Sequence, residues 1–425
     1  MTRSQGSARV QRWQPPPRPE WVQRINAEGE HLDLPSVIPL NAKSLIATAT
    51  ENTGLSDFGE DEWYQPFQVL CRSLEEEAKL TLVGRLMTRQ EVLLALEARL
   101  RIEDTYKQHP EIDDEEIVSP LMIIGQGRSG TSALQNLIAE DPQRGTERAW
   151  EVQRPCPPPE AATYRTDPRI GQAEGLIGMW SRVTPELRSM HDFTGWGPAE
   201  SIWAQVISFR MPWWPDPLWG YLPSFVNYFA DKNLANGYRY EKRLMKLLQW
   251  RNPRKQWVLK SPLALNHLPT VREAFPDMGF IWTHRDPVRA VASVVNLTGT
   301  LYWIRSDHPH QGDDLSVLTD SSVVAGVMSQ PIRWLEDGTL PRECLCNVHY
   351  RDFVRDPIST IEQIYRFFGS DMTDEARSAM RTYMEEHPRS GRPGHDYDLG
   401  TAEEIQLERA AFKEYTEYFN VPEEL

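Results

Sequence analysis

The chain has 425 residues, with 46 Lys and Arg against 61 Asp and Glu, and its formal net charge is −15. This length allows one large or two modest domains with a real hydrophobic core, which excludes a disordered tail or a disulfide-stapled mini-protein. The acidic composition argues against nucleic acid as a partner, and it requires any anionic ligand to be bound by a local cluster of positive charge.

The cysteines and the N-terminal residues bear on the cellular compartment. Cys71, Cys156, Cys344 and Cys346 have neither the spacing of a zinc knuckle nor that of a redox CxxC motif, so we expect reduced thiols. The N-terminus lacks the apolar core of a signal peptide, and no later apolar run is long enough to cross a bilayer. The sequence therefore predicts a soluble cytoplasmic protein.

The first part of the chain divides into two segments. Residues 1–20 are predicted to form a disordered arm, because their prolines lack N–H donors and no apolar periodicity accompanies them. Residues 21–115 have a helical pattern, in which Thr88 and Glu91 show the spacing of a capping box and apolar residues recur every four positions from Val92. We expect a helical region that packs on the remainder of the chain.

Residues 116–425 alternate between short apolar runs and helical segments. The run 121–124 is apolar on both faces and ends at Gly125, as a buried parallel strand does. Similar runs lie at 257–259, 280–282 and 345–348. Alternation of this kind predicts an α/β fold in which a central parallel sheet is flanked by helices.

Capping residues mark three helix starts in this region. Asp286 and Asp356 are each followed by a proline at the first helical position, and apolar periodicity follows both. Thr401 and Glu404 form a capping box for the last helix. By contrast, tryptophans and prolines interleave over residues 193–225, which excludes one long helix. This segment is either a cap on the core or the wall of an apolar acceptor pocket.

The most informative motif is the glycine-rich loop from Gly125 to Ser132, between a predicted strand and a predicted helix. Backbone N–H groups and a helix N-terminus in such a loop cradle a phosphate or a sulfate. Relative to the triphosphate-binding pattern GxxxxGK[ST], the lysine position holds Thr131. Arg128 lies inside the turn and offers a planar fork of donors suited to a tetrahedral anion.

Two further polar positions follow predicted strands. Lys260 ends the run 257–259, and open α/β sheets bind ligands at the carboxyl ends of their strands. Arg285 lies at the end of the next predicted strand, after the run 280–282. Ser293 lies two turns into the helix that follows. We expect Arg285 and Ser293 to converge on one anion.

Together these segments, which read GxxRSGTS, WxLKSP and THRDP with a later serine, resemble the sulfotransferases that use 3′-phosphoadenosine 5′-phosphosulfate (PAPS), in particular the bacterial-type group with a P-loop-like fold. The resemblance covers about residues 118–420 and implies PAPS as cofactor, with 3′-phosphoadenosine 5′-phosphate (PAP) as product. It implies that the loop binds the 5′-phosphosulfate, that Arg285 and Ser293 bind the 3′-phosphate, and that Lys260 and Arg128 neutralise the leaving group. The loop residues concerned are Gly127, Arg128, Ser129, Gly130, Thr131 and Ser132.

The general base is left open among several residues. Transfer of a sulfuryl group to a hydroxyl needs a base near the acceptor and cations near the leaving phosphate. Related branches use a glutamate beyond the first loop, which implies Glu151, with Glu147 nearby; other branches use a histidine, which implies His191, with Glu200 behind it. Because sulfuryl transfer carries less negative charge than phosphoryl transfer, fixed Arg and Lys can replace magnesium, and we predict no metal.

Three functions compete. The first is sulfuryl transfer to a hydroxyl of a small apolar or phenolic acceptor. The second is a P-loop-like nucleotide kinase or hydrolase, which Thr131 disfavours and which would need Mg²⁺. The third is a non-catalytic nucleotide-binding scaffold that has lost its base.

The basic segment 389–395 is either a loop against the 3′-phosphate, as the resemblance implies, or a solvated turn.

Overall fold

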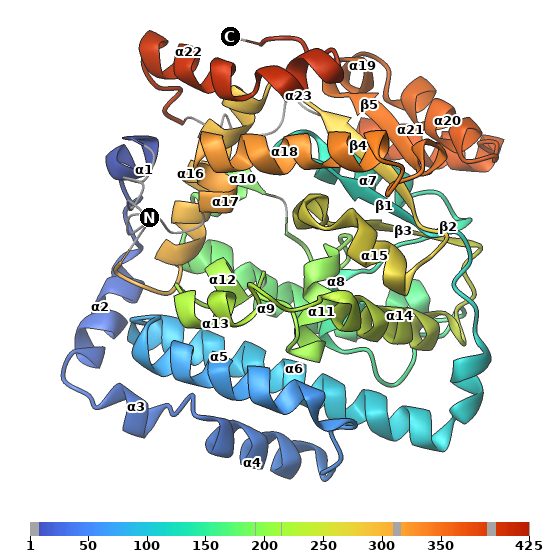
Figure 1. Ribbon diagram of the computed structural model, residues 1–425. Helices are drawn as coiled ribbons and strands as arrows, with labels where there is room; N and C mark the ends of the chain where they lie inside the picture. Colours follow the sequence, from blue (N-terminus) through green and yellow to red (C-terminus); the bar gives the residue numbers. More distant parts are fainter. Residues whose placement is uncertain (1–7, 192, 214, 309–315, 389–396, 425) are drawn as a thin grey trace.

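The computed structural model describes residues 8–191, 193–213, 215–308, 316–388 and 397–424 (Figure 1). Within these residues, five parallel strands form one sheet in the order β2-β3-β1-β4-β5. The strands are β1 (Leu121–Ile124), β2 (Arg144–Gly145), β3 (Gln256–Lys260), β4 (Gly279–His284) and β5 (Leu345–His349). Helices cover both faces, so the predicted α/β fold with a central parallel sheet is confirmed.

The centre of the sheet consists of predicted apolar runs. Strand β1 is fully buried between β3 and β4, with Leu121 opposite both Val258 and Gly279. Since the strands are parallel, their carboxyl ends share one edge, to which the loop after β1, Lys260 and Arg285 all belong. Strand β2 has only two residues, a length that no apolar pattern can reveal.

One face of the sheet packs against four helices. Strand side chains alternate between the faces, and Ile123, Val258 and Ile281 point to this one. The helices are α7 (Thr131–Ile138), α19 (Tyr350–Arg355), α20 (Pro357–Phe367) and α21 (Asp374–Glu386).

The opposite face carries Met122, Leu259 and Trp282 and belongs to a much larger apolar cluster. The helices of this face are α14 (Ala235–Gln249), α15 (Leu268–Ala274), α16 (Pro287–Trp303), α18 (Ser321–Glu336), α22 (Ala402–Ala411) and α23 (Lys413–Tyr418). The same cluster continues into the N-terminal helices, so buried side chains run without a break from the sheet to Val22.

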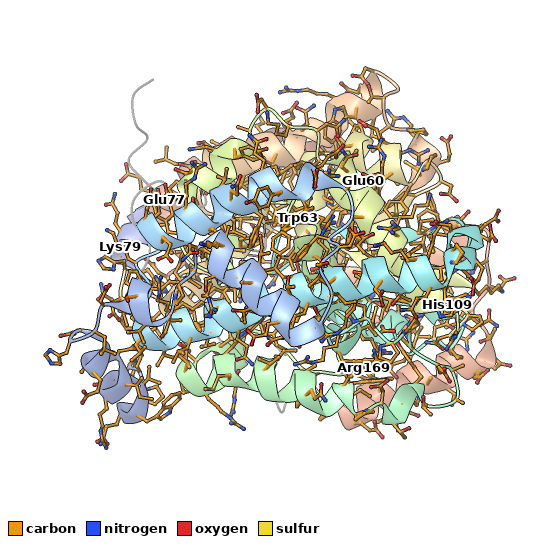
Figure 2. All side chains as sticks on the ribbon, turned by 90° about the horizontal axis from the view of Figure 1, so that it is seen from below. Glu60, Trp63, Glu77, Lys79, His109 and Arg169 are labelled. Atoms are coloured by element: carbon orange, nitrogen blue, oxygen red, sulfur yellow. The ribbon has the colours of Figure 1, made fainter. Side chains whose placement is uncertain are left out.

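The N-terminal helices form a layer at the bottom of Figure 1. They are α2 (Glu20–Gly29), α3 (Leu34–Val37), α4 (Ala42–Thr53), α5 (Tyr64–Glu76) and α6 (Leu82–Gln108). Figure 2 views this layer from below, with Glu60 and Trp63 before α5 and His109 at the end of α6. The helical character expected for this region is confirmed, whereas the domain boundary at residue 115 stays a prediction.

Further helices, most of them short, complete the fold. They are α8 (Ala149–Gln153), α9 (Arg169–Val183), α10 (Leu187–Met190), α11 (Ser201–Gln205), α12 (Pro215–Leu218), α13 (Pro223–Tyr228) and α17 (Ser316–Thr319), and α1 (Ala8–Arg12) precedes the first layer. The segment rich in tryptophan and proline contains three of these short helices, as its prolines require.

The predicted helix caps are correct except for one. Backbone N–H groups donate to the side chains of Asp286, Asp356 and Thr401. The capping box predicted at Thr88 is wrong, because α6 begins earlier and is capped by Thr81, whose hydroxyl accepts from a backbone N–H at 3.1 Å. The apolar pattern after Thr88 therefore belongs to the interior of a longer helix.

Residues 8–20 differ from the predicted disordered arm, of which residues 1–7 lie outside the described part. Trp13 Nε1 donates to a side-chain oxygen on α16 at 2.8 Å, and Trp303 Nε1 donates to a backbone carbonyl of the arm at 2.9 Å. The arm has little regular structure of its own, but α16 supplies hydrogen-bond partners that a local sequence pattern does not reveal.

The four cysteines form no disulfide. Across the described ranges, no helix combines the length and apolar character needed to cross a membrane, and no three His, Cys, Asp or Glu side chains gather as metal ligands would. The cellular compartment and metal-independent chemistry stay predictions.

Candidate active site

Three residues with left-handed backbone angles shape the loop between β1 and α7. The angle φ is +138° at Gly125, +72° at Arg128 and +95° at Gly130. A Cβ atom at Gly125 would lie 2.6 Å from Thr283 Oγ1, so only glycine fits there. The loop delivers the chain to the N-terminus of α7, where the first backbone N–H groups have no partner within the helix and attract an anion.

The Ser129 side chain of the loop forms hydrogen bonds within the protein. The Ser129 hydroxyl donates to Gln126 O at 2.6 Å and lies 2.7 Å from Thr283 Oγ1. Ser129 and Thr131 are both buried. The Ser129 side chain helps to hold the loop in shape, and the half-buried Arg128 and Ser132 are the loop side chains that remain accessible to a ligand.

The structure brings the loop together with the segment after β4. Arg128 Nε donates to Ser293 Oγ at 3.0 Å, although 165 residues separate them. Arg285 Nη1 donates to Arg128 O at 2.8 Å, across 157 residues. Two guanidinium groups and a hydroxyl from separate motifs thus form one group at the carboxyl edge of the sheet.

Arg285 makes a second set of contacts that the sequence does not reveal. Its Nε and Nη2 atoms donate to the carboxylate of Glu424, and its guanidinium lies 4.3 Å from the centre of the Tyr350 ring. Burial opposes the charge of Arg285, yet the hydrogen bonds to Glu424 leave the pKa of this guanidinium raised. Nothing in the sequence near Glu424 marks it as part of a site.

A second polar group lies at the end of β3. Lys260 is almost fully buried, and its Nζ donates to Ser132 Oγ at 3.2 Å and forms an ion pair with Glu200. His191 Nε2 lies 3.4 Å from Ser132 Oγ and 4.0 Å from Glu200 Oε1. The structure therefore gathers Ser132, Lys260, His191 and Glu200, all of them predicted site residues.

An aromatic wall adjoins this polar group. The His191 ring stacks on Phe193 with centroids 3.8 Å apart, and Phe193 contacts Trp180 and Trp203. Behind them lies a cavity lined by Trp180, Trp203, Trp219, Glu91 and apolar side chains from α6, α8 and α9. Glu91 accepts hydrogen bonds from the indole N–H groups of Trp180 and Trp219, so the wall is fixed in place. Segment 193–225 supplies part of this wall, and the contribution of α6 and α9 was not predicted.

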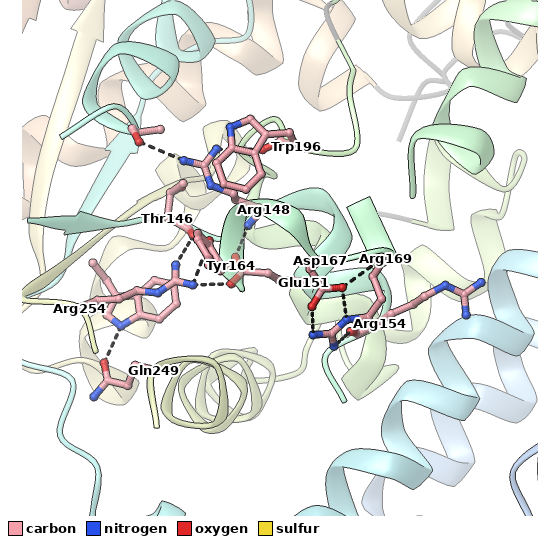
Figure 3. A network of polar contacts seen from close by, with 12 residues as sticks. Thr146, Arg148, Glu151, Arg154, Tyr164, Asp167, Arg169, Trp196, Gln249 and Arg254 are labelled. Atoms are coloured by element: carbon pink, nitrogen blue, oxygen red, sulfur yellow. Dashed lines mark hydrogen bonds and ion pairs between the residues drawn. The ribbon is translucent and has the colours of Figure 1, made fainter. Parts of the chain in front are cut away.

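Glu151 belongs to a different network (Figure 3). It is fully buried, forms an ion pair with Arg254 and accepts the backbone N–H of Arg148 at 3.0 Å. Arg254 also donates to Thr146 O at 2.7 Å and to the Tyr164 hydroxyl at 3.1 Å. These contacts give Glu151 the position of a buried cap and charge partner rather than that of a base open to an acceptor.

Glu147 is also sealed in the core. Burial raises its pKa well above the ordinary range, and no hydrogen-bond partner of its carboxyl is found among the described residues. Burial likewise raises the pKa of neighbouring Glu241 to about 7. A carboxyl without access to solvent or to a cavity is not placed to take a proton from an acceptor. The other predicted segment, 389–395, lies outside the described residues.

Comparisons with known proteins identify the family of the chain. The family model described as the sulfotransferase family matches residues 120–374, a range that includes the glycine-rich loop, Lys260, Arg285 and Ser293. A search of curated protein sequences found no match.

Two solved bacterial structures resemble the chain over most of its length. Sulfotransferase STF9 from Mycobacterium avium is 25% identical with a TM-score of 0.74, and the alignment covers 90% of this chain and 97% of that one. Sulfotransferase STF1 from Mycobacterium tuberculosis H37Rv is 25% identical with a TM-score of 0.70, over 88% of this chain and 98% of that one. Since the family model matches more than half of the chain and spans all three motifs, the chain belongs to the sulfotransferase family.

Proposed function

We propose that this protein transfers the sulfuryl group of PAPS to a hydroxyl of a small apolar or phenolic acceptor and releases PAP. The observation that carries the proposal is the contact of Arg128 with Ser293 and of Arg285 with the loop, at the sheet edge that also holds Lys260. In a chain of net charge −15, this group is the local positive site that an anionic ligand requires.

The donors at the site suit both ends of PAPS. The loop backbone, the N-terminus of α7 and the Ser132 hydroxyl offer hydrogen bonds to a tetrahedral phosphosulfate. The planar fork of Arg285, with Ser293 close by, suits a phosphate and would hold the 3′-phosphate. Arg128 contacts both halves of the site and would bridge them.

Lys260 and His191 are proposed to act on the two ends of the transferred group. As the bond from sulfur to the acceptor oxygen forms and the bond from sulfur to the phosphate oxygen breaks, Lys260 offsets the charge left on PAP. His191 takes the acceptor proton on Nε2, and Glu200 at 4.0 Å stabilises the resulting imidazolium. His191 replaces Glu151 in this role, because the Glu151 carboxylate is engaged with Arg254 in the core.

The aromatic wall supports the proposed acceptor class. Phe193 extends from the His191 ring to the cavity between Trp180 and Trp203, so an acceptor that reaches His191 packs against aromatic faces. Such walls favour flat apolar molecules with one polar end, of which a phenol is the simplest. Fixed arginine and lysine charges supply the electrostatic stabilisation, so the proposed reaction is independent of metal.

The test of the cofactor is thermal unfolding with PAP, compared with ATP and Mg²⁺. PAP at one hundred times its dissociation constant adds roughly 2.7 kcal/mol and raises the midpoint by a few degrees. Arg285→Ala removes this shift, whereas Arg355→Ala, which deletes an exposed arginine paired with Asp352, retains it. A shift with Mg²⁺–ATP alone would contradict the proposal and favour a kinase.

The test of the base uses PAP release from PAPS with a panel of phenols. His191→Asn lowers turnover by roughly 10²- to 10⁴-fold and leaves the affinity for PAP unchanged. A wild-type protein that binds PAPS but transfers to no acceptor would instead support the scaffold interpretation.

A further inference from the structure

The carboxylate of Glu424 occupies the anion-binding side of Arg285. Arg285 Nε donates to Oε1 at 3.0 Å and to Oε2 at 3.2 Å, and Nη2 donates to Oε2 at 2.9 Å. Arg289 Nε lies 3.8 Å from the same Oε2 atom. This two-point contact is the geometry with which an arginine binds a carboxylate or a phosphate.

The segment that carries Glu424 is fixed next to the site by further contacts. The backbone N–H of Glu424 donates to Asp286 Oδ2 at 2.8 Å, while the other oxygen of Asp286 caps helix α16. The neighbouring Glu423 forms an ion pair with Arg409 at 3.1 Å, and Val421 is buried. Glu424 is therefore held at Arg285 by several contacts of its segment.

We propose that Glu424 competes with the 3′-phosphate of the nucleotide for Arg285, and so selectively weakens the binding of 3′-phosphorylated nucleotides. This inference rests on the proposed function, in which Arg285 binds that phosphate. Nucleotide binding then requires Glu424 to leave Arg285, and the return of Glu424 assists the release of PAP.

The donors of Arg285 explain why the two anions exclude each other. One end of the guanidinium, Nη1, is used by the backbone carbonyl of Arg128. The remaining side, Nε and Nη2, is the one that Glu424 covers with both oxygens. A phosphate placed there would meet a carboxylate of the same sign at contact distance, which is unfavourable, so one of them must leave.

The experiment measures dissociation constants by calorimetry on the full chain, with PAP and with adenosine 5′-phosphate, which lacks the 3′-phosphate. Glu424→Gln removes the charge and keeps the shape, and it is expected to bind PAP about five times more tightly, as loss of one partly exposed ion pair predicts. Its affinity for adenosine 5′-phosphate is unchanged. Glu423→Gln is the matched control, because it removes the same charge one residue away from a pair with Arg409.

The outcomes separate this inference from the function on which it rests. Equal PAP affinity in Glu424→Gln and wild type would overturn the competition and leave the nucleotide site intact. A similar gain in Glu423→Gln, or an equal gain for adenosine 5′-phosphate, would also overturn it, because the effect would then be general charge. If folded wild-type protein bound no PAP, the proposed function itself would fail, and the competition with it. Glu424→Ala, which removes the whole carboxylate, is expected to repeat the gain.

Discussion

Strand β3 has a buried cation near each end, and a glutamate is paired with each of them. Before the strand, Arg254 pairs with Glu151, and their side chains are 6% and 0% exposed. At its carboxyl end, Lys260 pairs with Glu200, and these side chains are 2% and 19% exposed. The two pairs are chemically alike, but only the second has a glutamate with exposed surface.

The difference shows that the same kind of ion pair can lie enclosed in the core or beside a candidate ligand site. The pair at the start of β3 is closed by Tyr164 and by the backbone of Thr146 and Arg148, so it is enclosed in the core. The pair at the carboxyl end lies beside Ser132 and His191, where parallel sheets bind ligands. Position along the strand thus separates the enclosed Glu151 from Glu200, which lies beside the proposed site.

The largest expected effect is on the pair of Glu151 with Arg254, the sealed pair. Glu151→Gln leaves the Arg254 charge buried without a counter-ion, so the free energy of unfolding is expected to fall by roughly 3–5 kcal/mol. Urea denaturation measures this loss. The control is Glu160→Gln, whose pair with Arg251 is exposed on both sides and is expected to contribute less than about 1 kcal/mol. Equal losses in the two variants would remove the distinction between sealed and exposed pairs.

A substitution in the pair of Lys260 with Glu200, the open pair, is expected to affect turnover. Lys260→Met keeps the length of the side chain and removes its charge, and the rate of PAP release with a phenolic acceptor is expected to fall by roughly 10²- to 10³-fold. Thermal unfolding then checks that the fold is retained. Turnover within about threefold of wild type would mean that Arg128 alone supplies the electrostatic stabilisation.

A third expected effect concerns Glu241, the buried carboxyl that neighbours Glu147. Burial raises its folded-state pKa from 4.5 to about 7, so its contribution to stability is complete below pH 4.5 and is lost as the pH rises to about 7. Glu241→Gln removes this pH-dependent loss of unfolding free energy, which amounts to roughly 2–3 kcal/mol.

The measurement is the difference in unfolding free energy between this variant and wild type at several pH values. The difference is needed because burial lowers the pKa of His267 to about 4, and this histidine gives a pH dependence of opposite sign in both proteins. We expect the variant to gain on wild type between pH 4.5 and 7. A constant difference across that range would contradict the raised pKa of Glu241.

Much of the fold and half of the site follow from local sequence patterns. Buried parallel strands are short and apolar on both faces, and the cap at Asp286 depends on a few adjacent residues, so both are visible in the sequence. The loop at Gly125 is visible for the same reason, and parallel strands bring its motif to Lys260 and Arg285. Local chemistry combined with one rule of topology was sufficient for these features.

The remaining features depend on which distant groups share a space. The resemblance implies Glu151 as one candidate base, but the structure pairs this residue with Arg254 from a segment 103 residues away. The contact of Glu424 with Arg285 spans 139 residues, and the arm from residue 8 depends on α16 in the same way. No local pattern encodes such pairings, which is why the sequence identifies the cations and not their partners.

The smallest expected effect is the stability change at the open pair. Glu200→Gln is the same substitution as at Glu151, yet we expect a loss of about 1 kcal/mol or less, because the carboxylate is partly exposed and Lys260 keeps its hydrogen bond to Ser132. Urea denaturation of the two glutamine variants side by side tests this. Addition of PAP is expected to reduce the loss at Glu200 further, since the phosphate supplies Lys260 with a new counter-ion, and to leave the loss at Glu151 as it was. If the two variants lost equal stability, and PAP restored neither, the open pair would be a second structural pair, and Lys260 would not be available to a leaving phosphate.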